Sequence, residues 1–169
     1  MRLETQGLNK QNGVLAGIQM VSGPRVADNL KTAGKLIAQV VELGAQLVAL
    51  PEYFPIIGAA DADRVRAREP YGNGPVQDWL AATAARHEVW IVAGSIPLSA
   101  SQPHLMRNSC LVFNHGGDCV ARYDKIHLFG FKKGAESYNE SAFIEPGDTP
   151  VAIDTPYGRI ALSICYDLR

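Results

Sequence analysis

Short apolar runs separated by amphipathic segments make up the first half of the chain. The segment from Pro24 to Leu43 and the segment opened by Pro75 carry apolar residues at helical spacing, which predicts two amphipathic helices. The charged stretch 61–69 is expected to be a solvated surface segment. Apolar runs bounded by turn residues predict three buried strands, at residues 13–21, 46–50 and 89–93.

The second half of the chain favours paired strands. Gly116-Gly117 and Pro156-Tyr157-Gly158 each lie between two apolar runs, which is typical of hairpins. A polar, glycine-containing loop is expected between the two pairs. Strands separated by helices and followed by paired strands predict an α/β sandwich with a mixed sheet. The runs span residues 109–115 and 119–123 at the first turn, and 151–154 and 159–164 at the second.

Composition narrows the class of protein. The chain has 169 residues, of which 47% are hydrophobic, and a net charge of −1. This length suits one domain, which we place at residues 1–169, and such a domain buries roughly 70% of the unfolded surface. The hydrophobic content and low net charge exclude intrinsic disorder. Because there is no basic excess, general binding to nucleic acid is not expected.

The absence of targeting signals indicates a cytoplasmic protein without a membrane partner. No apolar run approaches the ~20 residues that a membrane-spanning helix needs, and the polar N-terminus is unlike a secretory signal peptide. The three cysteines, Cys110, Cys119 and Cys165, are too few and odd in number for a disulfide framework. We therefore expect a reducing compartment.

Three reactive side chains directly follow predicted strands. Glu52 follows QLVALP, Lys125 follows CVARYD and Cys165 follows RIALSI. In open α/β sheets ligands gather outside the carboxyl ends of strands, so these groups can converge. A thiolate can attack a carbonyl, a carboxylate can accept the proton, and an ammonium can stabilise the developing oxyanion. The three residues therefore form a chemically complete set for acyl transfer.

The strings LPEYF, RYDKIHLF and ICYDLR resemble the three catalytic segments of the nitrilase, or carbon–nitrogen hydrolase, superfamily. They occur in the order of that family and with similar separations, and the resemblance runs from about Val14 to Arg169. It implies that Glu52 is the general base, Lys125 the oxyanion-stabilising lysine and Cys165 the nucleophile. It also implies the α-β-β-α sandwich of this family.

A fourth residue and a branch of the family follow from the same resemblance. Glu140, in YNESAFIEPGDTP, matches a second glutamate that helps to position the substrate and the lysine. Tyr166 and Asp167 follow the cysteine where nitrile hydrolysers usually have Trp and Glu, which is similar to the amidase branches. Among these, the motifs most resemble the Nit-type amidases that act on ω-amides or deaminated glutathione.

The resemblance implies cysteine-dependent hydrolysis of a small linear amide, with release of ammonia and a carboxylate through a thioester. Lys125 Nζ and a backbone N–H such as that of Tyr166 would form the oxyanion hole. No metal or organic cofactor is expected. Members of this superfamily commonly dimerise and build larger assemblies, so a homo-oligomer is the expected state.

Arg169 lies only four residues after Cys165, whereas chains of this superfamily continue well beyond the cysteine. We therefore interpret the chain as the N-terminal portion of the domain, lacking the C-terminal part. This leaves a second function open, that of a catalytically silent fragment that binds or assembles with a partner. A third possible function retains the cysteine-dependent chemistry but changes the substrate or the acceptor, which gives an N-carbamoyl-amide hydrolase or an acyltransferase.

The histidines allow two further interpretations. His127 lies two residues after Lys125 and could be paired with a cysteine as in papain-like enzymes, although a structural histidine that forms hydrogen bonds near the site is the simpler interpretation. A metal cluster is disfavoured because the candidate ligands match no familiar zinc spacing. These ligands are His104, Cys110, His115 and Cys119.

Overall fold

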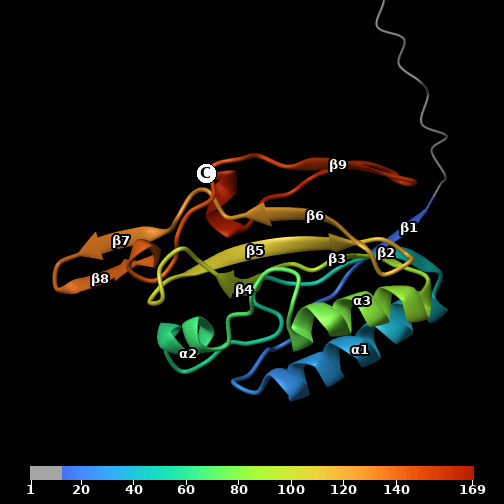
Figure 1. Cartoon of the computed structure of the whole chain (residues 1–169), viewed down its shortest axis with the longest axis horizontal. Coiled ribbons are helices and arrows are strands. Elements are labelled where there is room, and N and C mark those ends of the chain that lie inside the picture. The colour runs from blue at the N-terminus through green and yellow to red at the C-terminus, as the bar shows by residue number, and fades with distance from the viewer. Residues whose placement is uncertain (1–12) are drawn as a thin grey trace, which may run out of the picture.

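The computed structural model describes residues 13–169 and shows a mixed six-stranded sheet (Figure 1). The order is β1-β2-β3-β5-β4, and β6 also pairs with β5. Strands β1, β2 and β3 are parallel, whereas β5 is antiparallel to each of its neighbours. β3 and β4 lie along one edge of β5, and β6 lies along the other. The strands are β1 (Val14–Gly17), β2 (Ala45–Ala49), β3 (Trp90–Val92), β4 (Ile96–Ser99), β5 (Met106–Phe113) and β6 (Cys119–Asp124).

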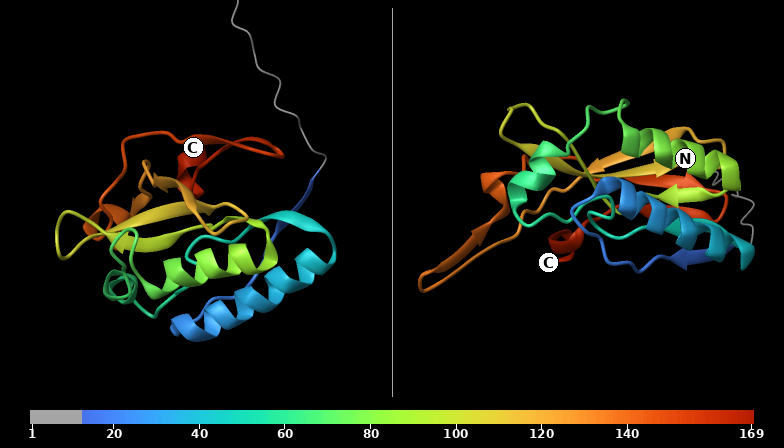
Figure 2. Two further views of the ribbon diagram at one scale, coloured as in Figure 1. Left: turned by 45° about the vertical axis from the view of Figure 1, so that its right-hand side comes forward. Right: turned by 90° about the horizontal axis from the view of Figure 1, so that it is seen from below.

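Two helices cover one face of this sheet, α1 (Val26–Glu42) and α3 (Pro75–His87) (Figure 2). Their apolar faces bury Ile37 and Leu80 against Val48, Ile91 and Leu111 of the sheet. Both predicted helices are confirmed, and burial of their apolar stripes is the main source of their stability. None of the helices within residues 13–169 is both long enough and apolar enough to cross a membrane.

A two-stranded antiparallel sheet lies over the opposite face, formed by β9 (Ala152–Thr155) and β10 (Gly158–Ala161) (Figure 1). Ile153 and Tyr157 pack there against Leu47, Trp90 and Val112. Residues 13–169 therefore form a helix layer and two sheet layers, and the α/β sandwich prediction is confirmed. Both predicted hairpins are also confirmed, β5–β6 and β9–β10.

The expectation that the charged stretch 61–69 is fully solvated is wrong for Glu69. Residues Asp61–Arg66 form the short helix α2, but Glu69 is buried. Its carboxylate accepts hydrogen bonds from the backbone N–H groups of Val76 at 2.7 Å and Gln77 at 3.3 Å. These N–H groups belong to the first turn of α3, where they have no partner within the helix and where negative charge is favoured.

The polar loop expected after β6 contains regular structure instead. An antiparallel hairpin, β7 (Gly130–Lys133) and β8 (Glu136–Asn139), projects from the sheet and leads into the single 3₁₀ turn η1 (Glu140–Ala142) (Figure 1). The hairpin strands are largely exposed on both faces, so they lack the apolar alternation that marks a half-buried strand. β4 was also missed, because Pro97 interrupts its pattern, and this proline is tolerated on an edge strand.

The last strand is shorter than predicted. β10 ends at Ala161, and Cys165 begins a 3₁₀ turn, η2 (Cys165–Leu168). Cys165 has a left-handed backbone with φ +51°. The expectation that the strand runs up to Cys165 is therefore wrong, because the backbone must leave the sheet to form this turn.

Substitution of Gly94 tests how tightly the loop after β3 approaches the end of β2. Gly94 has φ +54°, and a Cβ there would lie 2.1 Å from the carbonyl oxygen of Pro51. Gly94→Ala is expected to reduce the free energy of unfolding by roughly 2–5 kcal/mol in urea denaturation. Gly134 has a similar φ of +61°, but a Cβ at this position would meet no atom within 4 Å, so Gly134→Ala is expected to cost only about 1–2 kcal/mol. Equal losses would mean that backbone conformation, and not the close approach, is the constraint.

Candidate active site

The candidate site lies at the carboxyl ends of β2 and β6, which run in the same direction in the sheet. Glu52 follows β2 after a two-residue extension, and Lys125 directly follows β6. The Nζ atom of Lys125 lies 3.8 Å from Oε1 of Glu52. Two of the residues predicted to share a site are therefore in ion-pair contact.

Lys125 is completely buried and is held by Glu140. Its Nζ donates to Oε2 of Glu140 at 2.8 Å and to Oε1 at 3.0 Å. A buried ammonium is costly unless it is paired and hydrogen-bonded, so this contact is the reason that the lysine can occupy the interior. The prediction that Glu140 accompanies Lys125 agrees with this contact.

Glu140 is itself fixed by the chain around Phe129. The backbone N–H of Phe129 donates to Oε2 of Glu140 at 2.7 Å, and the backbone N–H of Glu140 donates to the Phe129 carbonyl at 2.9 Å. Glu140 is 7% exposed. Its carboxylate is thus oriented toward Lys125 by main-chain contacts at the base of the β7–β8 hairpin.

Glu52 is the accessible member of this group. Its side chain is 32% exposed, and its Oε1 accepts a hydrogen bond from Nδ2 of Asn108 at 2.8 Å. One buried cation therefore lies between two carboxylates, a buried one that receives three N–H contacts and a partly exposed one. This arrangement leaves Glu52 able to exchange protons with a molecule at the surface of the site.

The backbone after Glu52 turns sharply. Tyr53 has φ +52°, and its N–H donates to Oγ of Ser95 at 3.0 Å. The Tyr53 ring is buried, with the guanidinium carbon of Arg64 4.5 Å from the ring centroid. Burial raises the pKa of the Tyr53 hydroxyl above its usual value, and the opposing effect of Arg64 does not offset this. Tyr53 therefore stays protonated at neutral pH.

Cys165 lies at the start of η2 and is exposed. It lines a pocket of about 550 Å³ together with Phe129, Tyr166 and Arg169. The ring of Tyr166 meets that of Phe129 edge to face, with ring centroids 5.4 Å apart. Because the backbone of Phe129 binds Glu140, the turn that carries Cys165 packs on the same segment that orients the Lys125–Glu140 pair.

Asp167 ties η2 to the segment around Lys125. Its carboxylate accepts hydrogen bonds from the Ile164 N–H at 2.9 Å, the Tyr123 hydroxyl at 2.6 Å and the His127 N–H at 2.8 Å. The ring Nδ1 of His127 also lies 3.0 Å from Asp167. The imidazole therefore has a structural partner in Asp167, as the simpler interpretation of His127 expected.

Sequence reasoning missed Asn108, Ser95 and Asp167 as members of the site. Asp167 stands inside the motif ICYDLR, but its role depends on contacts 40 and 44 residues away. Asn108 and Ser95 lie in or beside apolar strands, where a single polar residue gives no periodic signal. The role of the Tyr166 N–H in an oxyanion hole stays a prediction.

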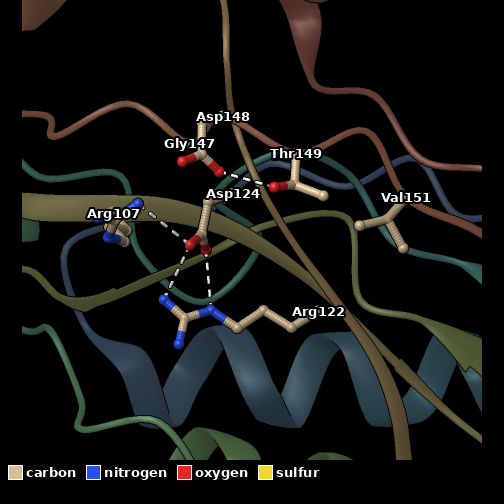
Figure 3. A pocket seen from close by; sticks show the side chains of 7 residues that line it. All are labelled: Arg107, Arg122, Asp124, Gly147, Asp148, Thr149 and Val151. Carbon is tan, nitrogen blue, oxygen red and sulfur yellow. Dashed lines mark hydrogen bonds and ion pairs between the residues drawn. The ribbon is translucent and has the colours of Figure 1, made fainter.

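A second pocket, of about 230 Å³, lies beside Asp124 (Figure 3). Asp124 accepts from Arg122 Nε and Nη2, both at 3.0 Å, and from Arg107 Nη1 at 3.3 Å. Arg107 also pairs with Glu145. Each guanidinium is therefore already paired with carboxylate, and we do not place the active site here. Within residues 13–169 no cluster of three His, Cys, Asp or Glu side chains could hold a metal ion.

Neutralising Glu140 tests the pairing of the buried lysine. Glu140→Gln keeps the shape of the side chain but leaves the buried Lys125 ammonium with only the more distant, partly exposed Glu52 as a charged partner, so the free energy of unfolding is expected to fall by up to roughly 3–5 kcal/mol. Asp154→Asn is the control, since Asp154 and Arg159 form an exposed pair at 3.9 Å that is expected to contribute less than about 1 kcal/mol. Similar losses in urea denaturation of both variants would contradict the importance of the buried pair.

The pH dependence of unfolding tests the anchor at Asp167. Burial raises the pKa of this carboxyl, but hydrogen bonds from Tyr123, His127 and Ile164 outweigh it, and the net shift is downward. A carboxyl whose folded pKa is lowered stabilises the fold above its unfolded pKa of about 3.9, and this contribution is lost as pH falls through the folded value. The stability difference between the wild type and Asp167→Asn is therefore expected to be constant near pH 5 and to shrink below about pH 4.

Urea denaturation between pH 3 and pH 5.5 measures this difference. Asp154→Asn again serves as the control, and its difference from the wild type is expected to stay small throughout. A difference for Asp167→Asn that does not change with pH would show that the carboxylate charge is not what anchors the turn.

Comparison with known proteins places this chain in a family. The model of the carbon-nitrogen hydrolase family matches residues 15–169. Deaminated glutathione amidase of Yersinia enterocolitica is 38% identical over 162 residues, which cover 94% of this chain and 56% of that protein. Human omega-amidase NIT2 is 34% identical over 157 residues, covering 92% and 55% of the two chains.

Solved structures agree with the sequence matches. The NitFhit protein of C. elegans superimposes with a TM-score of 0.80 at 29% identity, covering 91% of this chain and 38% of that one. Nit3 of Saccharomyces cerevisiae, a member of the nitrilase superfamily, gives a TM-score of 0.73 at 26% identity, with 87% and 52% covered. The chain spans about half the length of the curated relatives that it matches. With the family match extending over almost all of its length, this chain belongs to the carbon–nitrogen hydrolase family.

Proposed function

We propose that this chain supplies the catalytic residues for hydrolysis of a small linear amide, with Cys165 as the nucleophile. The observation that carries the proposal is the group formed by Glu52, Lys125 and Glu140, in which one buried ammonium lies between two carboxylates. Two contacts of η2 support the assignment of Cys165 to the same site, that of Tyr166 with Phe129 and that of Asp167 with the backbone N–H of His127. The names of the relatives, which are amidases, support the reaction class.

Acylation begins with transfer of a proton from Cys165 Sγ to the carboxylate of Glu52. The thiolate attacks the amide carbon, and negative charge develops on the carbonyl oxygen. Lys125 Nζ, together with a backbone N–H such as that of Tyr166, stabilises this oxyanion. As the tetrahedral intermediate collapses, Glu52 returns the proton to the leaving nitrogen, ammonia departs and a thioester remains.

Deacylation uses the same groups in a second cycle. Glu52 takes a proton from water, and the resulting hydroxide attacks the thioester carbon. Lys125 stabilises the second oxyanion, whose collapse releases the carboxylic acid and the Cys165 thiolate, and Glu52 returns its proton to the sulfur. Glu140 keeps Nζ of Lys125 in place throughout, since it accepts from it with both carboxylate oxygens.

We propose an ω-amide that carries a carboxylate at its far end as the substrate class. The pocket beside Cys165 has one guanidinium in its lining, that of Arg169, which can bind a carboxylate through two parallel N–H groups. The names of the relatives, deaminated glutathione amidase and omega-amidase, agree with an amide of this kind. We further propose that the protein works in the cytoplasm as a homo-oligomer and that residues 1–169 belong to one domain.

Alkylation of the cysteines tests the nucleophile without any assumption about the substrate. Burial raises the pKa of Cys110 to about 12 and also raises that of Cys119, so both thiols serve as slow internal controls. Cys165 is expected to react fastest with iodoacetamide, well below the pH at which the controls react, and Lys125→Ala is expected to slow it. Peptide mass spectrometry measures the rate at each cysteine. Equal behaviour of all three thiols would favour the catalytically silent binding module.

Product analysis then tests the reaction. Ammonia release is measured with short amides with and without a distal carboxylate, and Cys165→Ala is expected to lower kcat/KM by a factor of about 10³ or more. Cys119→Ala, which removes an exposed thiol outside the site, is the control and is expected to retain activity. Release of CO₂ with ammonia would indicate a carbamoyl substrate instead, and consumption of an added amine would indicate acyl transfer. Unchanged hydrolysis by Cys165→Ala would overturn the mechanism.

A further inference from the structure

Asn108 contacts both of the charged residues that meet in the site. It lies in β5 and is completely buried. Its side-chain Nδ2 donates to Oε1 of Glu52 at 2.8 Å, and its carbonyl oxygen accepts from the backbone N–H of Lys125 at 2.9 Å. One residue thus connects the end of β2 to the end of β6.

The strand holds Asn108 rigidly. In β5 it pairs with Pro97 of β4, and its neighbour Ser109 pairs with Asp124 of β6. The surrounding positions of β5 are almost all buried, so an amide here is expensive unless its polar atoms have partners. The side-chain position is therefore determined by the sheet and not by the flexible end of a loop.

Packing alone does not account for an asparagine at this position. Within the part of the chain that the structure describes, Oδ1 of Asn108 is buried and has no hydrogen-bond partner. An unsatisfied buried acceptor costs roughly 1–3 kcal/mol, whereas an apolar residue of the same size would avoid that cost. The amide makes its side-chain hydrogen bond to Glu52, and this is what the residue gains.

We infer that Asn108 is a positioning residue for Glu52, and this inference rests on the proposed function. The side-chain N–H of Asn108 holds Oε1 of Glu52. Oε2 is then the oxygen that exchanges protons with Cys165 and water. A donor to the charged form also keeps the carboxylate ionised, as a general base requires. Through its carbonyl, Asn108 sets the end of β6 and so the 3.8 Å separation of Glu52 from Lys125.

Other charged groups face Glu52 and remain in place when Asn108 is changed. Lys125 contacts it directly, and Glu140 acts from the far side of Lys125. The Tyr53 hydroxyl also interacts electrostatically with Glu52, and the Arg64 guanidinium lies over the Tyr53 ring. A change in the titration of Glu52 in an Asn108 variant is therefore attributable to the lost hydrogen bond.

Asn108→Leu separates positioning from folding. It keeps the number and branching of the side-chain heavy atoms and removes both the donor to Glu52 and the unpartnered Oδ1. We expect the midpoint of thermal unfolding to stay the same or rise, whereas kcat/KM falls by about 10- to 100-fold, because a hydrogen bond to a charged group is lost. The acidic limb of the Cys165 alkylation profile is expected to move to higher pH, because the base that accepts the thiol proton has lost its donor.

Asn108→Asp and Asn114→Ala complete the experiment. Asn108→Asp keeps the shape but replaces the donor with a second carboxyl group against Glu52, so it is expected to move the acidic limb of the Cys165 alkylation profile in the same direction. Asn114 donates through Nδ2 to Asp118 at 2.9 Å in an exposed turn, and Asn114→Ala is the matched control that should leave the titration unchanged. Titration of the Glu52 carboxyl by ¹³C NMR, assigned with Glu52→Gln, follows the protonation of Glu52 without turnover.

The outcomes distinguish the inference from the proposed function. If the wild-type Cys165 reacts as an ordinary thiol, the proposed function fails, while the NMR titration still tests the contact between Asn108 and Glu52. If wild-type Cys165 is activated but Asn108→Leu leaves both the alkylation profile and the Glu52 titration unchanged, the inference alone is overturned. A loss of activity accompanied only by a lower unfolding temperature would also overturn it, since that is the result of a structural role.

Discussion

The buried charge of Lys125 is the constraint on which the rest of the site depends. Moving an ammonium from water into a protein interior costs several kcal/mol, even after relaxation of the surroundings. The carboxylate of Glu140 offsets this cost, and the backbone of Phe129 holds that carboxylate in turn. The chain that leaves the sheet as the β7–β8 hairpin must therefore return with η1 against Lys125. The electrostatics of one lysine thus determine the path of the segment between β6 and β9.

Strand β5 connects the parts of the sheet that position Glu52 and Lys125. It pairs with β3 and β4 along one edge and with β6 along the other, so it joins the two parts of the sheet that carry Glu52 and Lys125. β2 and β6 lie three strand spacings apart, which is roughly 14 Å. The turn after β2 and two long side chains close that gap to 3.8 Å. Asn108 lies at the position of β5 from which it forms hydrogen bonds with both Glu52 and Lys125.

Two residues of the site, Tyr53 and Cys165, have left-handed backbones with φ +52° and φ +51°. For residues with a Cβ this conformation is costly and persists only where the surroundings impose it. Ser95 imposes it on Tyr53 through the backbone N–H, and Asp167 holds the turn of Cys165 through Ile164, Tyr123 and His127. At Tyr53 this turn brings the carboxylate of the preceding Glu52 to the surface. At Cys165 it brings the thiol to the surface.

Local sequence patterns determined much of the secondary structure and the family of this protein. The apolar stripes of α1 and α3, the glycine-containing turns of the two predicted hairpins and the apolar cores of β2, β3 and β5 are short-range patterns, and the structure confirms each of them. The motifs around Glu52, Lys125 and Cys165 likewise identified the family, because each motif is a short stretch of consecutive residues that can be read without the fold. Tertiary structure alone decided which side chains meet. The capping of α3 by Glu69, the contact of Asn108 with Glu52 and the contact of Asp167 with Tyr123 join residues that are 7, 56 and 44 positions apart. No periodic pattern reports such contacts, because they arise from the way that sheet edges and turns place buried polar groups within reach of one another.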